Sequence, residues 1–148
     1  MKFTDYPTCD RTWVTLCVTG DDLAPDDLSA AFGIVPSYVN VLGERRRPYS
    51  SAVNKLGGWF LSSQGLVPSA DVRLHLDWLL NQVAAKHDVL CWAREQGWSP
   101  VVSCYWASAH GHGGPELTPQ LMGRLAELEL SIWFDVYFLN GPPYTNDG

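Results

Sequence analysis

The chain has 148 residues, of which 46% are hydrophobic and 18% are charged, and its 16 Asp and Glu outnumber its 10 Lys and Arg. This composition excludes disordered, collagen-like and coiled-coil chains, and the length is that of one domain that buries about 68–70% of its unfolded surface. No apolar stretch approaches the roughly 20 residues of a membrane-spanning helix, and the first residues lack the apolar centre of a secretory signal. We therefore expect a cytoplasmic protein with no membrane contact.

The predicted domain organisation is an N-terminal extension (residues 1–11), a single domain (residues 12–140) and a flexible C-terminal tail (residues 141–148). The four cysteines contain no Cys-x-x-Cys pair, so we expect free structural thiols in a reducing compartment. These cysteines are Cys9, Cys17, Cys91 and Cys104.

The first half of the chain predicts one long strand, one helix and two short strands. Residues 12–19 alternate between apolar and other side chains, which is typical of a half-buried strand. Pro25, followed by two acidic residues, predicts the first turn of a helix, and Gly33 predicts its end. Short strands are predicted around residues 38–41 and 59–63.

The second half predicts helices and strands in alternation. Apolar residues recur every three or four positions over residues 69–83, which predicts a helix with one apolar face. A helical segment over residues 87–96 either continues that helix or breaks from it. Residues 101–107 predict a strand rich in β-formers, residues 118–128 a capped helix, and residues 132–138 a last alternating strand.

The resulting element order is βαββα(α)βαβ, which predicts an α+β fold. Its first six elements match the ferredoxin-like, or split βαβ, plan, here extended by one αβ unit. We expect a single, mostly antiparallel sheet with helices packed on one face. The helices are predicted to cover the following strand residues: Val14, Leu16, Val18, Ile132, Phe134, Val136 and Phe138.

Six short motifs occur in series along most of the chain. They are VTGDDL (residues 18–23), GGWFLSS (57–63), HLDWLL (75–80), SCYW (103–106), LTPQL (117–121) and FDVYF (134–138). In this order and spacing, the motifs resemble the bacterial domain-of-unknown-function family 4279 over about residues 12–138. The resemblance implies a small cytosolic α+β domain, and it brings no established activity, cofactor or catalytic residue.

The strand face opposite the helices is the candidate binding surface. An exposed aromatic face indicates binding, because Trp and Tyr bury a large area and keep a polar group for recognition. In the alternative interpretation, a loop or a second subunit covers this face and Asp135 is hydrogen-bonded beneath it. The face is predicted to hold Trp13, Thr15, Cys17, Trp133, Asp135 and Tyr137, joined by Trp59 and by either Trp106 or Tyr105.

A basic loop follows the second predicted strand. It contains Arg45, Arg46 and Arg47, with Lys55 in the same connection. These side chains either form a rim of the aromatic surface or stay solvated and balance nearby acids. Nucleic acid is not the expected partner, because a net charge of −6 repels a polyanion.

The sequence supports metal binding and catalysis less than it supports a binding surface. His110 and His112, with Glu116 nearby, are possible metal ligands, but their glycine-rich loop is typical of a mobile connector. No nucleophile elbow or phosphate-binding loop is present in the sequence. We therefore expect no metal, no cofactor and no catalytic residue.

These observations predict a non-enzymatic module that binds a protein, in an immunity or accessory role. The alternative is a small enzyme or ligand-binding domain with a pocket near Asp135, Tyr137 and the Arg45–Arg47 loop. A homodimer through a sheet face or an edge strand is also expected, because a sheet with helices on one side leaves the other side to be covered.

Overall fold

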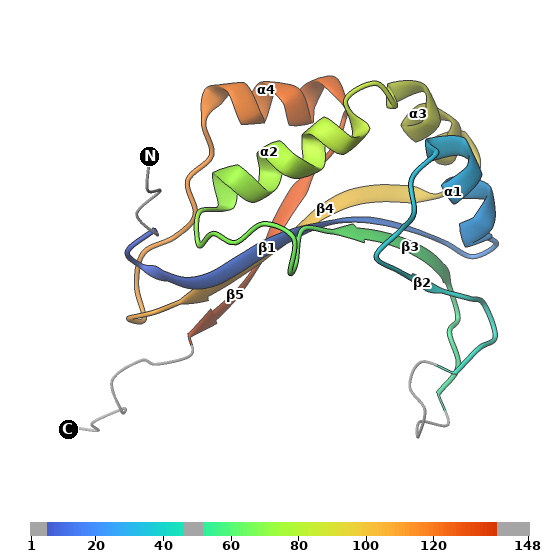
Figure 1. The fold of residues 1–148 in the computed structure, drawn as a ribbon. Coiled ribbons are helices and arrows are strands. Elements are labelled where there is room, and N and C mark those ends of the chain that lie inside the picture. The colour runs from blue at the N-terminus through green and yellow to red at the C-terminus, as the bar shows by residue number, and fades with distance from the viewer. Residues whose placement is uncertain (1–5, 46–51, 139–148) are drawn as a thin grey trace.

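The computed structural model describes residues 6–45 and 52–138 (Figure 1). β1 begins at Cys9, three residues before the predicted domain start, and the predicted tail lies outside the described residues. The helical region after residue 70 is two helices separated by residues 84–86. The elements are β1 (Cys9–Gly20), α1 (Pro25–Phe32), β2 (Tyr38–Asn40), β3 (Gly57–Ser62), α2 (Val72–Val83), α3 (His87–Glu95), β4 (Ser99–Ser108), α4 (Pro119–Glu127) and β5 (Ile132–Phe138).

The five strands form one sheet in the order β2-β3-β1-β4-β5. β1 is antiparallel to both β3 and β4, β2 is antiparallel to β3, and β5 runs parallel to β4. All four helices pack on one face of this sheet (Figure 1). The predicted α+β class is confirmed, and nothing in the arrangement conflicts with the split βαβ plan. No helix of the described residues is both long enough and apolar enough to cross a membrane.

Local signals explain where two of the helices begin and end. Pro25 is in the first turn of α1, where a missing N–H costs nothing, and Gly33 ends the helix in the left-handed conformation with φ of 66°. In α4, the Thr118 hydroxyl accepts a hydrogen bond from the backbone N–H of Leu121 at 3.2 Å, and Pro119 follows it. The predicted caps at these three ends are confirmed.

The hydrophobic core lies between the sheet and the helices. The apolar face of α2 packs on β1, and its Leu76, Leu79 and Leu80 are fully buried. On β1, the predicted inward residues Val14, Leu16 and Val18 are also fully buried. The alternation seen in the sequence therefore separates the core face of β1 from its opposite face.

The prediction that Trp59 and Trp106 lie on the face opposite the helices is wrong. Their exposed fractions are 0% and 1%. Trp59 is paired with Val18 of β1, and Trp106 with the buried Thr12. Because directly paired residues of neighbouring strands project to the same face, both indoles belong to the core. The Trp59 ring is stacked on Phe32 at 4.8 Å.

The prediction that helices cover Phe134, Val136 and Phe138 of the last strand is also wrong, whereas Ile132 of the same strand packs against the core. Phe134, Val136 and Phe138 are 37%, 43% and 64% exposed. Their side chains project toward the helix side, since Phe134 pairs with the buried Cys104. However, β5 is the outermost strand, and the helices make their main contacts with β1, β3, β4 and each other. The apolar face of β5 therefore remains accessible.

A buried hydrogen-bond network joins the end of β3 to α2. The Ser63 hydroxyl and His75 Nδ1 are 2.6 Å apart, and His75 Nε2 lies 2.7 Å from the Ser69 carbonyl. Because a carbonyl only accepts, Nε2 carries the proton and Nδ1 accepts from Ser63. Burial lowers the pKa of His75, against opposing contributions from the Ser69 carbonyl and the charge of Asp71. Both Ser63 and His75 are inaccessible, so this pair is structural.

Candidate protein-binding face

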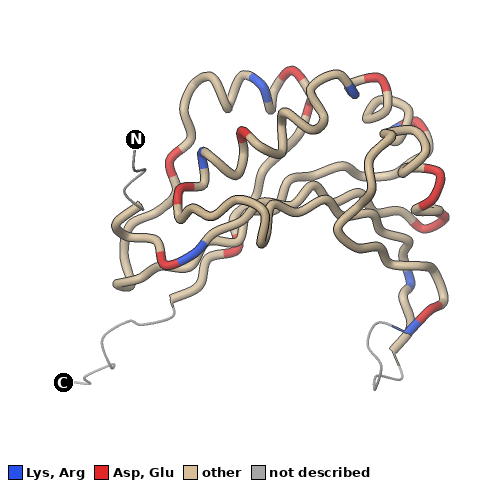
Figure 2. Tube along the Cα trace, in the orientation of Figure 1, with Lys and Arg blue, Asp and Glu red and all other residues tan. Residues whose placement is uncertain are grey.

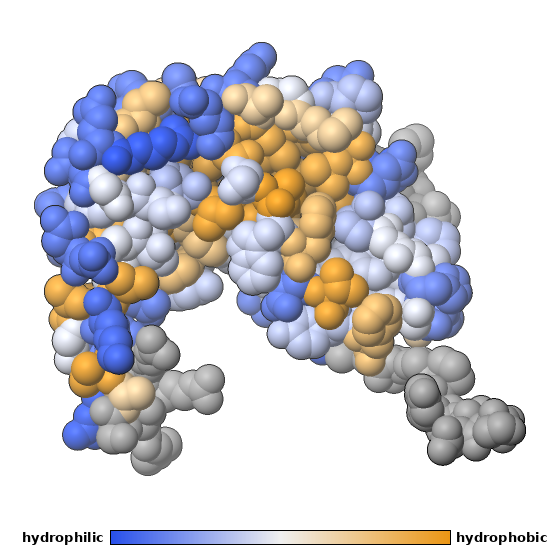
Figure 3. Space-filling model, turned by 180° about the vertical axis from the view of Figure 1, so that it is seen from behind, coloured by the Kyte–Doolittle hydropathy of each residue, from blue (hydrophilic) through white to orange (hydrophobic). Residues whose placement is uncertain are grey.

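The side of the sheet opposite the helices is open to solvent. The molecule is arched, and this open side lines the hollow of the arch (Figure 1, Figure 3). We call it the open aromatic face. Its members come from all five strands and are Trp13, Tyr38, Phe60, Tyr105, Trp133, Asp135 and Tyr137.

A row of aromatic rings crosses β1, β4 and β5. The Trp13 and Tyr105 rings are stacked with centroids 4.0 Å apart and an interplanar angle of 8°. The Tyr105 and Tyr137 centroids are 4.9 Å apart. Trp133 lies on the same face of β5 and is 50% exposed. Tyr105, not Trp106, is thus the β4 residue of this face, and the row presents exposed ring surface to solvent.

A second aromatic pair lies toward the other edge of the sheet, where sequence reasoning had placed none. Tyr38 of β2 and Phe60 of β3 are stacked at 4.5 Å, and Tyr38 is exposed. Trp59 and Phe60 are adjacent, so one must face the core and the other the open side. The alternation of β1 alone does not say which, and only the pairing of Cys17 with Phe60 decides it.

Asp135 contributes the carboxylate of this face. It is half-buried on β5, opposite Tyr105, and a hydrogen bond with its carboxylate raises the pKa of Tyr137, helped by the carboxylate charge. The Tyr137 hydroxyl therefore stays protonated beside this carboxylate. Asp135 and Tyr137 thus add polar groups to the aromatic row.

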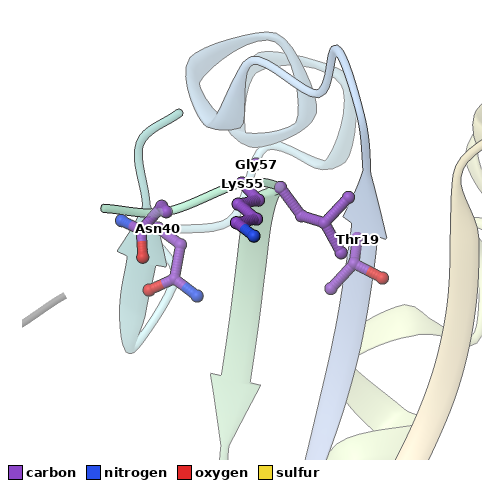
Figure 4. A pocket seen from close by; sticks show the side chains of 6 residues that line it. Thr19, Asn40, Lys55 and Gly57 are labelled. Carbon is purple, nitrogen blue, oxygen red and sulfur yellow. The ribbon is translucent and has the colours of Figure 1, made fainter. Parts of the chain in front are cut away.

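A polar pocket lies at the β2 side of the sheet, next to the open aromatic face (Figure 4). Its volume is about 340 Å³, and Lys55 lies in it between Asn40 of β2 and Thr19 of β1. Asn54 is held by a hydrogen bond from its Nδ2 to the Val41 carbonyl at 3.1 Å. Amide and ammonium donors therefore meet in one concavity.

Arg45 of the basic loop and Asp135 of the open aromatic face lie on opposite sides of the molecule. Arg45 is exposed, forms a β-bridge with Val53, and belongs to the arm that extends beyond β2 and β3 (Figure 2). Arg46 and Arg47 lie outside the described residues. Asp135 is on β5, at the far edge from β2. The structure therefore does not bring Arg45 to Asp135, and the predicted pocket combining them is wrong for the residues it describes.

His110, His112 and Glu116, the possible metal ligands in the sequence, do not converge on one point in the structure. The rings of His110 and His112 are 6.1 Å apart, but Glu116 is paired with Arg73 at 3.3 Å. A different group, His87, Cys91 and Glu129, does converge. Two of its members were visible in the sequence as residues four apart on a predicted helix, a spacing that puts them on one face. The third is 38 positions further on, so only the fold reveals it.

The prediction that the cysteines are free thiols is confirmed. All four cysteines are free, and burial raises the pKa of Cys9, Cys17 and Cys104 to about 11. A thiol with such a pKa is almost entirely protonated at neutral pH and is a poor nucleophile.

The raised pKa values of these three thiols predict selective alkylation. When the folded protein is treated with iodoacetamide at neutral pH, we expect Cys9, Cys17 and Cys104 to react slowly and Cys91 to be modified first, because burial disfavours the reactive thiolate of the first three. Mass spectrometry of peptides gives the order of modification. In denaturant, all four should react at similar rates, and preferential reaction of Cys17 in the native protein would contradict the prediction.

One known family matches almost the whole length of the domain. Residues 8–139 match the model of a domain of unknown function, DUF4279. The chain belongs to the DUF4279 family. The match covers β1 to β5, so the family domain and the sheet with its four helices are the same unit. Comparisons with curated proteins and with solved structures found no match.

Proposed function

We propose that this chain is a non-enzymatic, bacterial cytoplasmic module that binds a protein partner on its open aromatic face, in an immunity or accessory role. The observation that supports this most is the row formed by Trp13, Tyr105 and Tyr137, with Trp133 beside it. The core is already complete on the other face of the sheet, so these rings are not required to close it. Contiguous exposed aromatic surface of this kind is typical of interaction sites.

The charges around the face favour a particular kind of partner segment. Asp135 lies at the β5 edge, and Lys55 and Arg45 lie at the β2 edge. A segment with aromatic or aliphatic side chains in its centre, a basic group toward β5 and an acidic group toward β2 complements this arrangement. The concave shape suits a loop or peptide that enters the arch (Figure 3).

Capture of the partner from the native host, followed by calorimetry with the purified pair, tests the proposal. We expect Trp133→Ala to weaken binding by about 2 kcal/mol or more, the size of effect that a tryptophan anchor of an interface has. Met122→Ala is the matched control, because Met122 is also 50% exposed but lies on α4, in the helix layer. If Met122→Ala weakens binding and Trp133→Ala leaves it unchanged, the open aromatic face is not the interface.

A small-ligand site is the second candidate, and the polar pocket beside β2 favours it. The Lys55 ammonium and the amide of Asn40 are suited to a small carboxylate or phosphate. A thermal-shift screen with simple carboxylates and inorganic phosphate tests this. Stabilisation that disappears in Lys55→Met supports the ligand site, and the absence of any stabilisation in the wild-type protein contradicts it.

Self-association through β5 extends the proposal. Ser131 accepts a backbone hydrogen bond from the N–H of Val102 at 2.9 Å. Because backbone groups alternate in direction along a strand, the odd-numbered residues of β5 bond to β4. The N–H and C=O groups of Phe134 and Val136 therefore point away from the sheet. A seven-residue apolar edge of this kind is a template for pairing with another strand.

A two-fold antiparallel pairing of β5 with β5 of a second copy can be centred on Asp135 or on Val136. Centred on Asp135, the pairing would place two carboxylates directly opposite each other, which is destabilising. Centred on Val136, it places Asp135 opposite Tyr137 of the second copy and Phe134 opposite Phe138 of the second copy. This second register covers the three apolar side chains that the helices leave exposed, so it is the one we propose.

Val136→Pro tests the dimer with little effect on the monomer. Proline removes only the N–H of residue 136, which points away from β4 at the outer edge of the sheet that the described residues form, and edge positions tolerate proline. In light scattering at high micromolar concentration, we expect wild type at twice 16.4 kDa and the variant at the monomer mass. A wild-type protein at the monomer mass contradicts the dimer, and a Val136→Pro variant that stays dimeric contradicts the β5 interface.

A further inference from the structure

Three side chains of different chemistry converge on the surface between α3 and the turn that follows α4. His87 and Cys91 are on α3, and Glu129 is in the connection between α4 and β5. The Cys91 Sγ lies 3.5 Å from His87 Nε2, and that nitrogen lies 3.5 Å from Glu129 Oε2. All three atoms are within 4.8 Å of one another. An imidazole, a thiol and a carboxylate thus face one point in space.

The fold holds this arrangement in two ways. His87 and Cys91 are four residues apart on one helix, so their side chains project from the same face. Glu129 adopts a left-handed conformation with φ of 54°, which is uncommon for a residue other than glycine. Arg94 maintains this turn by donating from Nη2 to the Leu128 carbonyl at 2.9 Å and to the Glu129 carbonyl at 2.8 Å.

We infer that His87, Cys91 and Glu129 form a binding site for a divalent metal ion of borderline softness, with zinc as the best fit. In tetrahedral zinc sites the metal–ligand distances are about 2.0–2.3 Å, so neighbouring ligand atoms are about 3.3–3.8 Å apart. The two distances of 3.5 Å measured from His87 Nε2 match this spacing. The ligand set also matches, since thiolate and imidazole favour zinc over magnesium or calcium.

The site provides three protein ligands and leaves the fourth position to water or to a group from a partner. His87 and Glu129 have exposed side chains, so an ion can enter from solvent. Arg94 Nη1 lies 3.8 Å from Glu129 Oε2 and competes for this carboxylate, which weakens the site without blocking the thiolate. A bound ion would join α3 to the connection that leads into β5.

Cobalt provides the direct test, because a thiolate bound to Co²⁺ gives a charge-transfer band in the near ultraviolet. We expect the full chain, kept reduced by a phosphine, to bind one Co²⁺ or Zn²⁺ in calorimetry and to show this band with Co²⁺. Cys91→Ser should abolish the band, and Glu129→Gln should weaken binding at least about tenfold, since even residues behind the ligands change affinity by about 10–100-fold. The matched control is the double variant His110→Ala/His112→Ala, which should bind as wild type does.

A measurement on the wild-type protein makes the test independent of variant folding. In the folded protein, Zn²⁺ at saturating concentration should slow the alkylation of Cys91 at least about tenfold. In denaturant, Zn²⁺ should leave the alkylation rates of the other three thiols unchanged. Absence of the charge-transfer band, unchanged alkylation of Cys91, or loss of binding only in the His110→Ala/His112→Ala variant would each overturn the inference.

Discussion

Replacing Trp59 with alanine is expected to lower the free energy of unfolding by about 3–5 kcal/mol, the range for large aromatic side chains in cores. Trp59 is fully buried, its ring is stacked on Phe32, and its Nε1–H donates to the Ser29 hydroxyl at 3.0 Å. Alanine at this position leaves a cavity and removes the partner of that hydroxyl. The packing around α1 and β3 cannot close a gap of indole size.

Trp133→Ala is the matched control for this experiment. It removes the same side chain from the open aromatic face, where Trp133 is 50% exposed, and should cost no more than about 1 kcal/mol. Urea denaturation followed by far-ultraviolet circular dichroism measures both values without depending on tryptophan fluorescence. Equal losses in the two variants would show that the faces of the sheet have been assigned incorrectly.

The second large effect concerns the buried His75. His75→Ala is expected to destabilise the fold by about 2–4 kcal/mol, because it creates a cavity and leaves the Ser63 hydroxyl and the Ser69 carbonyl without their partner. Equilibrium denaturation at pH 7.5 measures this cost. A loss below about 1 kcal/mol would mean that water replaces the imidazole freely.

The same residue predicts a pH dependence of stability. The pKa of His75 is lowered by burial in the folded protein, whereas an unfolded chain has a histidine pKa of about 6.5. Above about pH 6.5 both states are neutral at this site and its stabilisation is complete. As the pH falls below this value, the unfolded state takes up a proton that the folded state does not, so stability decreases by up to about 1.4 kcal/mol per pH unit.

Variants separate this effect from other titrations. His75→Ala should reduce the decrease in stability between about pH 7 and 5, because the group responsible is absent. Val83→Ala is the control, since it creates a cavity on the same helix without removing a titratable group, and it should keep the wild-type dependence. An unchanged profile in His75→Ala would show that other groups cause the acid sensitivity.

The sequence by itself was sufficient to predict most elements of the fold, although it left open whether the helical region after residue 70 is one helix or two. Val14, Leu16 and Val18 alternate because one face of β1 meets the core, and the leucines of α2 recur with the helical period for the same reason. Pro25, Gly33 and Thr118 located helix ends because capping depends on a few consecutive residues. Such features are local, so they can be recognised without knowing what lies on the other side of the core.

The tertiary structure alone decided which residues face each other and which strand lies at the edge. From the sequence alone, either Trp59 or Phe60 could face the core, and only the pairing of β3 with β1 shows that it is Trp59. Phe134 has the alternation of a covered strand, yet β5 is outermost and its apolar residues stay exposed. Strand order also separates Arg45 from Asp135, and the turn after α4 brings a distant carboxylate to the helix with His87 and Cys91. These relations depend on how whole elements pack, and a pattern within one element contains no information about its neighbours.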